Sequence, residues 1–137
     1  MPLVAAAIAQ LSKTLIRSNH QQLSWSILLA YSGMPSGHAA MTVALTMIIG
    51  LEKGWNYPGF AIALVFTLLV LRDAAGLRRQ LGTQGLVLNE LVVDLENDDV
   101  LDKRYPHLLE KIGHTPAQIA VGALLGMLVA VIGHYLF

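Results

Sequence analysis

The pattern of hydrophobic and polar positions divides this chain into four apolar segments. They cover residues 3–16, 35–51, 60–71 and 117–137. The fourth segment has Gln118 and His134 as its only strongly polar residues, and a membrane-spanning helix needs about 20 mainly apolar residues. The fourth segment therefore predicts a membrane-spanning helix. The first segment is short for a membrane span and predicts a short or tilted helix.

Turn and capping signals indicate where these helices begin and end. Residues 54–59 combine proline, glycine and two aromatic residues, which predicts a turn at the membrane–water interface. Thr115 followed by Pro116 predicts the N-cap and the first helical position of the last segment. Pro35 is similarly expected in the first turn of the second segment.

The one long polar region covers residues 78–111. Its middle, residues 85–95, places apolar residues at helical spacing and predicts an amphipathic helix on the protein or membrane surface. A partly inserted segment at residues 23–30 is a further alternative. The whole pattern predicts an all-α, integral membrane helical bundle of about four to five helices in one domain, residues 1–137.

The composition supports a membrane protein. Hydrophobic residues make up 55% and charged residues 13%, against about a quarter charged in soluble domains, and the mean hydropathy is +0.58. The absence of cysteine excludes disulfide and thiolate chemistry. A net charge of zero, without a basic stripe and interleaved aromatics, predicts no nucleic-acid partner; membrane lipid is the expected partner.

The order of the segments predicts where ionisable residues gather. In an antiparallel bundle, the end of the first segment, the start of the second, the end of the third and the start of the fourth share one side of the membrane. The ionisable residues at these ends are Lys13, Arg17, His38, Asp73, Arg78, Arg79 and His114. Asp73 is a functional candidate because it lies at a membrane boundary; its alternative is a salt bridge to a neighbouring arginine.

The stretch from Gly33 to His38 carries residues suited to phosphate chemistry. At a helix start, Ser36 and Gly37 would present backbone N–H groups without helical partners, which form an anion site. Gly37 allows a close approach, and His38 exchanges a proton near neutral pH. The alternative is a helix start with a chance histidine.

Three stretches resemble a known family. Residues 35–38, Pro-Ser-Gly-His, are similar to the PSGH motif of the type 2 phosphatidic acid phosphatases (PAP2) and vanadium haloperoxidases. Together with residues 73–80 and 113–116, the run 33–40 resembles the divergent branch of that superfamily, small bacterial and plastid membrane proteins. The resemblance covers roughly residues 30–135 and implies a bacterial inner-membrane protein.

The resemblance also implies a mechanism. In the superfamily, one histidine attacks phosphorus to form a phospho-histidine, and the PSGH histidine protonates the leaving oxygen. Carried over to this chain, His114 is the nucleophile and His38 the acid, with no metal or other cofactor; Asp73 is a third catalytic candidate. The residues expected to hold the phosphate are Ser36, Gly37, Arg78, Arg79, Lys13 and Arg17.

The chain departs from the family pattern in two motifs. In the third motif, Leu108 replaces an arginine, and Gln118 replaces an aspartate that orients the nucleophile. The first motif has no match, and Lys13 and Arg17 are its nearest stand-ins. The predicted function is a metal-independent phosphatase acting on a lipid-linked phosphate or pyrophosphate. The alternative is a non-catalytic membrane protein that binds a phospholipid or polyprenyl phosphate.

Other features leave alternatives open. His107, Glu110 and His114 lie near one helix face if that region is helical, a spacing that allows a metal site. Gly122 and Gly126 have the small-x-x-x-small spacing of close helix packing. The expected contact lies within one chain, with a homodimer as the alternative.

The distribution of lysine and arginine predicts an orientation. Eight of them lie on the side of the motifs, and only Lys53 lies on the other side. Because positive residues stay cytoplasmic, the site is expected on the cytoplasmic side, with Lys103 and Arg104 in the cytoplasm.

Overall fold

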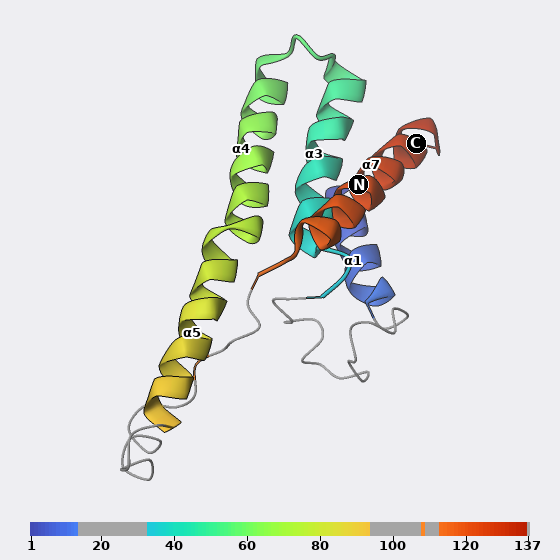
Figure 1. Cartoon of the computed structure of the whole chain (residues 1–137). Coiled ribbons are helices and arrows are strands. Elements are labelled where there is room, and N and C mark those ends of the chain that lie inside the picture. The colour runs from blue at the N-terminus through green and yellow to red at the C-terminus, as the bar shows by residue number, and fades with distance from the viewer. Residues whose placement is uncertain (14–32, 94–107, 109–112, 137) are drawn as a thin grey trace.

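The computed structural model describes residues 1–13, 33–93, 108 and 113–136, which are mainly helical and include no strand. Figure 1 shows a bundle from which one helix projects. The helices are α1 (Pro2–Ser12), α3 (Gly37–Lys53), α4 (Pro58–Ala75), α5 (Leu77–Val93) and α7 (Pro116–Leu136). The predicted all-α bundle of about four to five helices is confirmed for these residues.

Helices α4 and α5 follow each other as one long rod with a break at Gly76 (Figure 1). The N–H of Gly76 donates to the carbonyl of Arg72 at 2.9 Å and caps α4. The sequence predicted a separate helix beginning at residue 85, and this boundary was wrong by eight residues, since α5 begins at Leu77. The reason is local: leucine, arginine and glutamine at 77–81 are good helix formers, so the helix resumes directly after Gly76.

Two helical stretches, Pro58–Leu91 and Pro116–Leu136, are long and apolar enough to cross a membrane. The second confirms the predicted last helix, which is long and apolar enough for the expected span. Helix α1 has 11 residues and is roughly 17 Å long, about half of a hydrocarbon core of ~30 Å. It is too short to cross alone, as expected of the first segment. Residues 14–16 and the alternative segment 23–30 lie outside the described residues.

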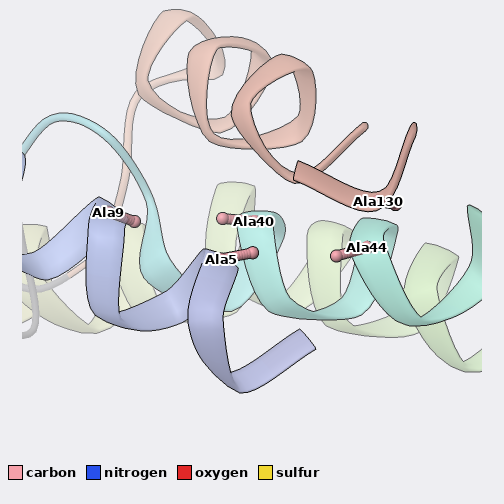
Figure 2. Packing of buried hydrophobic residues seen from close by; sticks show 5 residues of the cluster. All are labelled: Ala5, Ala9, Ala40, Ala44 and Ala130. Carbon is pink, nitrogen blue, oxygen red and sulfur yellow. The ribbon is translucent and has the colours of Figure 1, made fainter. Parts of the chain in front are cut away.

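Helix α3 is the centre of the bundle and packs against α1, α4 and α7. Its contacts with α1 and α7 use small side chains. Figure 2 shows this cluster, whose members are fully buried: Ala5 and Ala9 of α1, Ala40 and Ala44 of α3, and Ala130 of α7. Small residues let helix backbones approach closely, which is how helices associate where lipid removes the hydrophobic driving force.

The two glycines with small-x-x-x-small spacing lie against α3. A Cβ atom at Gly126 would overlap the carbonyl oxygen of Ala40, and one at Gly122 would overlap the carbonyl oxygen of Ser36. The contact within one chain, which the spacing predicted, is therefore present. Helix α3 therefore covers the face of α7 that carries Gly122 and Gly126. The homodimer stays a prediction with no surface on this face.

Substitution of Gly126 by alanine should destabilise the bundle. The added methyl group meets backbone atoms of α3, which cannot rotate away, so α7 has to shift. Overpacking of this kind costs about 1–3 kcal/mol. Thermal unfolding in detergent measures the loss, and Leu124→Ala at an exposed position of α7 is the control. An unchanged unfolding temperature for Gly126→Ala would contradict the close contact.

Buried threonines join α3 to α4. The hydroxyl groups of Thr46 and Thr67 lie 2.8 Å apart, and the Thr67 hydroxyl also lies 3.0 Å from the carbonyl oxygen of Thr42. These bonds satisfy hydroxyl groups that are buried inside an apolar bundle. They join the middle of α3 to the middle of α4 and so fix the register of the two helices, whose start and end, respectively, lie near the candidate site.

Candidate functional site

A cavity of about 220 Å³ lies where α1 ends and α3 begins. Seven residues line it: Ala6, Gln10 and Lys13 from α1 and the residue after it, Gly37, His38 and Met41 from α3, and His114 from the connection before α7. The predicted meeting of helix ends is confirmed for the described residues. Arg17, expected at the same place, lies outside them.

The start of α3 is fixed by Ser36 as N-cap. Its hydroxyl accepts a hydrogen bond from the N–H of Ala39 at 3.4 Å, and its own N–H donates to the carbonyl of Gln118 at 3.1 Å. The expectation that Pro35 occupies the first turn was wrong, because the capping serine is extended and the helix begins at Gly37.

These contacts separate the roles of Ser36 and Gly37. Ser36 is fully buried, and both its N–H and its hydroxyl have partners within the fold. Gly37 lines the cavity at the first helical position, where N–H groups lack helical partners. Of the two residues, Gly37 is the one that lines the cavity, and phosphate binding by Ser36 and by Gly37 stays a prediction.

The chain before α7 docks onto the break between α4 and α5. Gly113 has φ +94°, and a Cβ atom there would lie 2.7 Å from the backbone nitrogen of Arg79. The N–H of His114 donates to the carbonyl of Ala74 at 3.1 Å. Ala74 is in the last turn of α4, where carbonyl groups lack helical partners. The break thus provides the acceptor that brings His114 to the cavity.

His114 is only 4% exposed, and neither ring nitrogen has a hydrogen-bond partner among the described residues. Burial and, to a smaller extent, positive charge on Lys13, His38 and Arg78 together lower the pKa of His114 from 6.5 to about 4. The ring is therefore neutral near pH 7. A neutral imidazole has a free lone pair, which a nucleophile requires.

Protonation of His114 should oppose folding. The His114 ring binds a proton near pH 6.5 in the unfolded chain and only near pH 4 in the folded chain. The contribution of the neutral ring to the free energy of unfolding is therefore complete above pH 6.5 and is lost as the pH falls toward 4. Relative to His114→Gln, which does not titrate, the wild type should lose up to about 3 kcal/mol of unfolding free energy. Thermal unfolding of both proteins across this range measures the difference. Parallel pH profiles would contradict a buried, neutral ring.

Three basic residues predicted for the site occupy different environments. Lys13 lines the cavity, is 2% exposed, and has its pKa lowered by burial. Arg78 donates from Nε to Oδ2 of Asp73 at 2.7 Å, and its charge reaches His114. Arg79 has an exposed side chain and does not line the cavity. Phosphate binding by Arg79 stays a prediction that nothing in this geometry supports.

The salt bridge anticipated for Asp73 is present, since its carboxylate pairs with Arg78 across the helix break. Both side chains are about a third exposed, so the pair adds little stability. Its effect is to hold the guanidinium at the cavity side of the bundle. Asp73 is thus placed to position Arg78, while a direct catalytic role stays a prediction.

Gln118 forms a capping box with Thr115 at the start of α7. The Thr115 N–H donates to Oε1 of Gln118 at 2.9 Å, and the Gln118 N–H donates to the Thr115 hydroxyl at 3.3 Å. The predicted N-cap and the proline after it are confirmed. The side chain that stands where the family has an aspartate is therefore engaged with Thr115, and not with the ring of His114.

Three residues that line the cavity were not predicted from the sequence: Ala6, Gln10 and Met41. Of these, only Gln10 gave a signal in the sequence, since it lies one turn before Lys13. Leu108 is held away from the cavity lining, because its N–H and carbonyl both bond the side chain of Asn89 at 3.0 Å.

Two of the three residues of the metal alternative, His107 and Glu110, lie outside the described residues. Within the described ranges, no three histidine, aspartate or glutamate residues gather closely enough to hold a metal ion. The alternative therefore receives no support from the geometry.

Known proteins match this chain over most of its length. A family model described as "Divergent PAP2 family" matches residues 1–129. A Bacillus subtilis (strain 168) protein described as "Uncharacterized membrane protein YuiD" is 33% identical over 126 residues, which cover 85% of this chain and 80% of that protein. No solved structure matches the chain. The match to the family model includes every residue that lines the cavity.

Proposed function

Because this chain belongs to the divergent PAP2 family, as its motifs predicted, we propose that it is a metal-independent phosphatase of a lipid-linked phosphate or pyrophosphate. The observation that carries the proposal is one cavity lined by His38, His114 and Lys13. In-line phosphoryl transfer needs a nucleophile and a leaving-group acid around one phosphate, with positive charge beside it. The apolar bundle brings a lipid substrate to that cavity.

The proposed reaction has two steps. A ring nitrogen of His114 attacks phosphorus, and the bond from phosphorus to the bridging oxygen breaks. The leaving lipid alcohol, or lipid monophosphate from a pyrophosphate, takes a proton from His38. Water then attacks the phospho-histidine, His38 accepts the proton of the water, and inorganic phosphate leaves. The low pKa of His114 supports this role, since only the neutral ring attacks.

Cationic and backbone groups around the cavity would hold the phosphoryl group. Lys13 lines the cavity, and Arg78 lies close to His114, held by Asp73. Positive charge beside the phosphate stabilises the developing charge of a transferring phosphoryl group. Gly37 adds a helix N-terminus, which favours an anion.

The test is phosphate release in detergent from a panel of lipid phosphates and pyrophosphates, with a chelator present. We expect turnover that the chelator does not reduce. Loss of turnover with chelator, restored by a divalent metal, would favour the metal alternative and overturn the proposal.

One observation favours the second candidate, binding without hydrolysis. Among the described residues no side chain bonds the ring of His114, and Gln118 caps α7 instead. An unoriented ring attacks less well than one held by a carboxylate. Saturable binding of lipid phosphates without phosphate release would support this candidate.

We also propose that the site faces the cytoplasm, on the asymmetry of lysine and arginine. The chain has no cysteine, so single cysteines report on each end. Asn56→Cys, in the turn opposite the site, should react with an impermeant thiol reagent in spheroplasts. Ala117→Cys, exposed beside the site, should react only after permeabilisation. The reverse pattern would place the site outside.

A further inference from the structure

One side of helix α5 carries exposed leucines at regular spacing. Leu77, Leu81, Leu88 and Leu91 are each half or more exposed, although leucine is a residue that folding usually buries. Together with Gln84, they follow one another at intervals of four, three, four and three residues. This is the a/d spacing of a coiled-coil heptad, and we refer to these five residues as the leucine seam.

The leucine seam has the narrow width of a surface that meets one other helix. A helix that packs on a globular core usually adds apolar residues at the e or g positions. Here these flanking positions hold Arg78 and Gly85 on one side and Gln80 and Val87 on the other. Arg78 is the one charged residue among them, and its guanidinium already pairs with Asp73. Two such seams therefore meet without bringing like charges together.

The chain's own connection to α7 covers a different face of α5. Gly82, Gly85 and Asn89 are buried, and the Asn89 side chain bonds both the N–H and the carbonyl of Leu108 at 3.0 Å. Gly82 and Asn89 each follow a leucine of the seam by one residue, which is roughly 100° around the helix. Within the described residues, the connection thus leaves the leucine seam open to a partner.

Helix α5 also extends beyond the length of a membrane span. Helix α4 has 18 residues and is roughly 27 Å long, about the thickness of a hydrocarbon core of ~30 Å. Helix α5 continues α4 away from the other helices (Figure 1), and its first turns carry exposed polar residues, Arg79, Gln80 and Thr83. When α4 spans the membrane, α5 therefore projects into water, where exposed leucines favour association.

We propose that the leucine seam is the interface of a homodimer in which two α5 helices pack in parallel as a short coiled coil. Both copies enter the membrane in the same orientation, so a two-fold axis along the membrane normal relates them and their α5 helices run in the same direction. Each leucine of the seam then meets its counterpart, and Gln84 meets Gln84 of the second copy. Amide groups at such a position bond each other and fix the register.

The membrane makes so short a coiled coil sufficient. The leucine seam covers about two heptads, and isolated helices of this length are marginal in water. Membrane spans confine both copies to one plane, which raises the effective concentration of one α5 helix at the other. The dimer is therefore expected of the full chain in membranes.

Disulfide cross-linking of the full chain in isolated membranes tests the interface, since the chain has no cysteine of its own. Gln84→Cys places a thiol at the centre of the seam, where parallel helices bring two Cα atoms within the ~7 Å that a disulfide bridges. We expect a covalent dimer on mild oxidation, resolved by gel electrophoresis without reductant. Leu86→Cys, exposed on another side of the same helix, is the matched control and should stay monomeric.

Charge placed in the leucine seam separates a defined interface from chance collision. Adding Leu81→Lys and Leu88→Lys to Gln84→Cys should reduce cross-linking at least about tenfold, since leucine burial is lost and like charges meet. Adding Leu86→Lys instead should leave cross-linking unchanged. Far-UV circular dichroism of the purified variants should match the wild type, because lysine is a good helix former and these positions are exposed.

Three results would overturn the homodimer. Equal cross-linking of Gln84→Cys and Leu86→Cys would indicate collision without a defined interface. A monomeric Gln84→Cys whose thiol reacts readily with a water-soluble reagent would show an uncovered seam. A monomeric Gln84→Cys whose thiol is protected would show that lipid or the chain's own residues 94–107 cover the seam. Phosphate release is not a readout here, so the homodimer stands or falls independently of the proposed function.

Discussion

Replacement of His114 by alanine is expected to abolish phosphate release and the phospho-histidine intermediate with it. His38 is the other histidine that lines the cavity, but in the proposed reaction it protonates the leaving oxygen, which leaves His114 to attack phosphorus. Single-turnover reactions with labelled substrate measure the intermediate as phosphoprotein that is labile in acid and stable in base. The wild type should accumulate it when quenched early, and His114→Ala should not.

Two controls make this result specific to the nucleophile. His134→Ala removes a histidine in the last turn of α7, at the other end from the site, and should leave both turnover and phosphoprotein unchanged. Free imidazole added to His114→Ala should restore part of the turnover, because the truncated side chain leaves room for it. Retained phosphoprotein in His114→Ala would remove this residue as nucleophile.

Replacement of His38 by alanine is expected to slow turnover of a lipid phosphate by roughly 10²–10⁴, the usual contribution of a general acid. The variant should fold normally, since His38 is exposed, and the bond that the hydroxyl of Thr42 donates at 2.9 Å goes to the backbone carbonyl of His38, which alanine keeps. The second step also needs His38 as base. Phosphoprotein should therefore persist longer in this variant than in the wild type.

The leaving group separates acid catalysis from binding. A nitrophenyl phosphate has a leaving oxygen that needs no proton, so His38→Ala should slow formation of its phosphoprotein much less than that from a lipid phosphate. His38→Gln, which keeps a hydrogen-bond donor without a titrating proton, should behave like alanine. An equal loss for both substrates would instead assign His38 to phosphate binding.

Much of this fold follows from local properties of the sequence. The last span, the turn at residues 54–59 and the cap at Thr115 were predicted because hydrophobic runs and capping residues act over one or two turns. The gathering of His38, Asp73 and His114 also followed, since the order of apolar segments fixes which helix ends meet. The start of α5 was misplaced because polar surface residues do not stop a helix made of good helix formers.

What the sequence determined by itself is the class of protein, the helices and the end of the bundle where the chemistry would lie. Only the tertiary structure decided which residues at that end share a cavity. Ser36 and Gly37 are neighbours, yet Ser36 is buried against α7 while Gly37 lines the cavity; Arg78 pairs with Asp73, whereas Arg79 points outward. The docking of His114 on the carbonyl of Ala74 was equally hidden. These outcomes depend on the rotation of each helix about its axis, which is set by contacts between residues far apart in the chain.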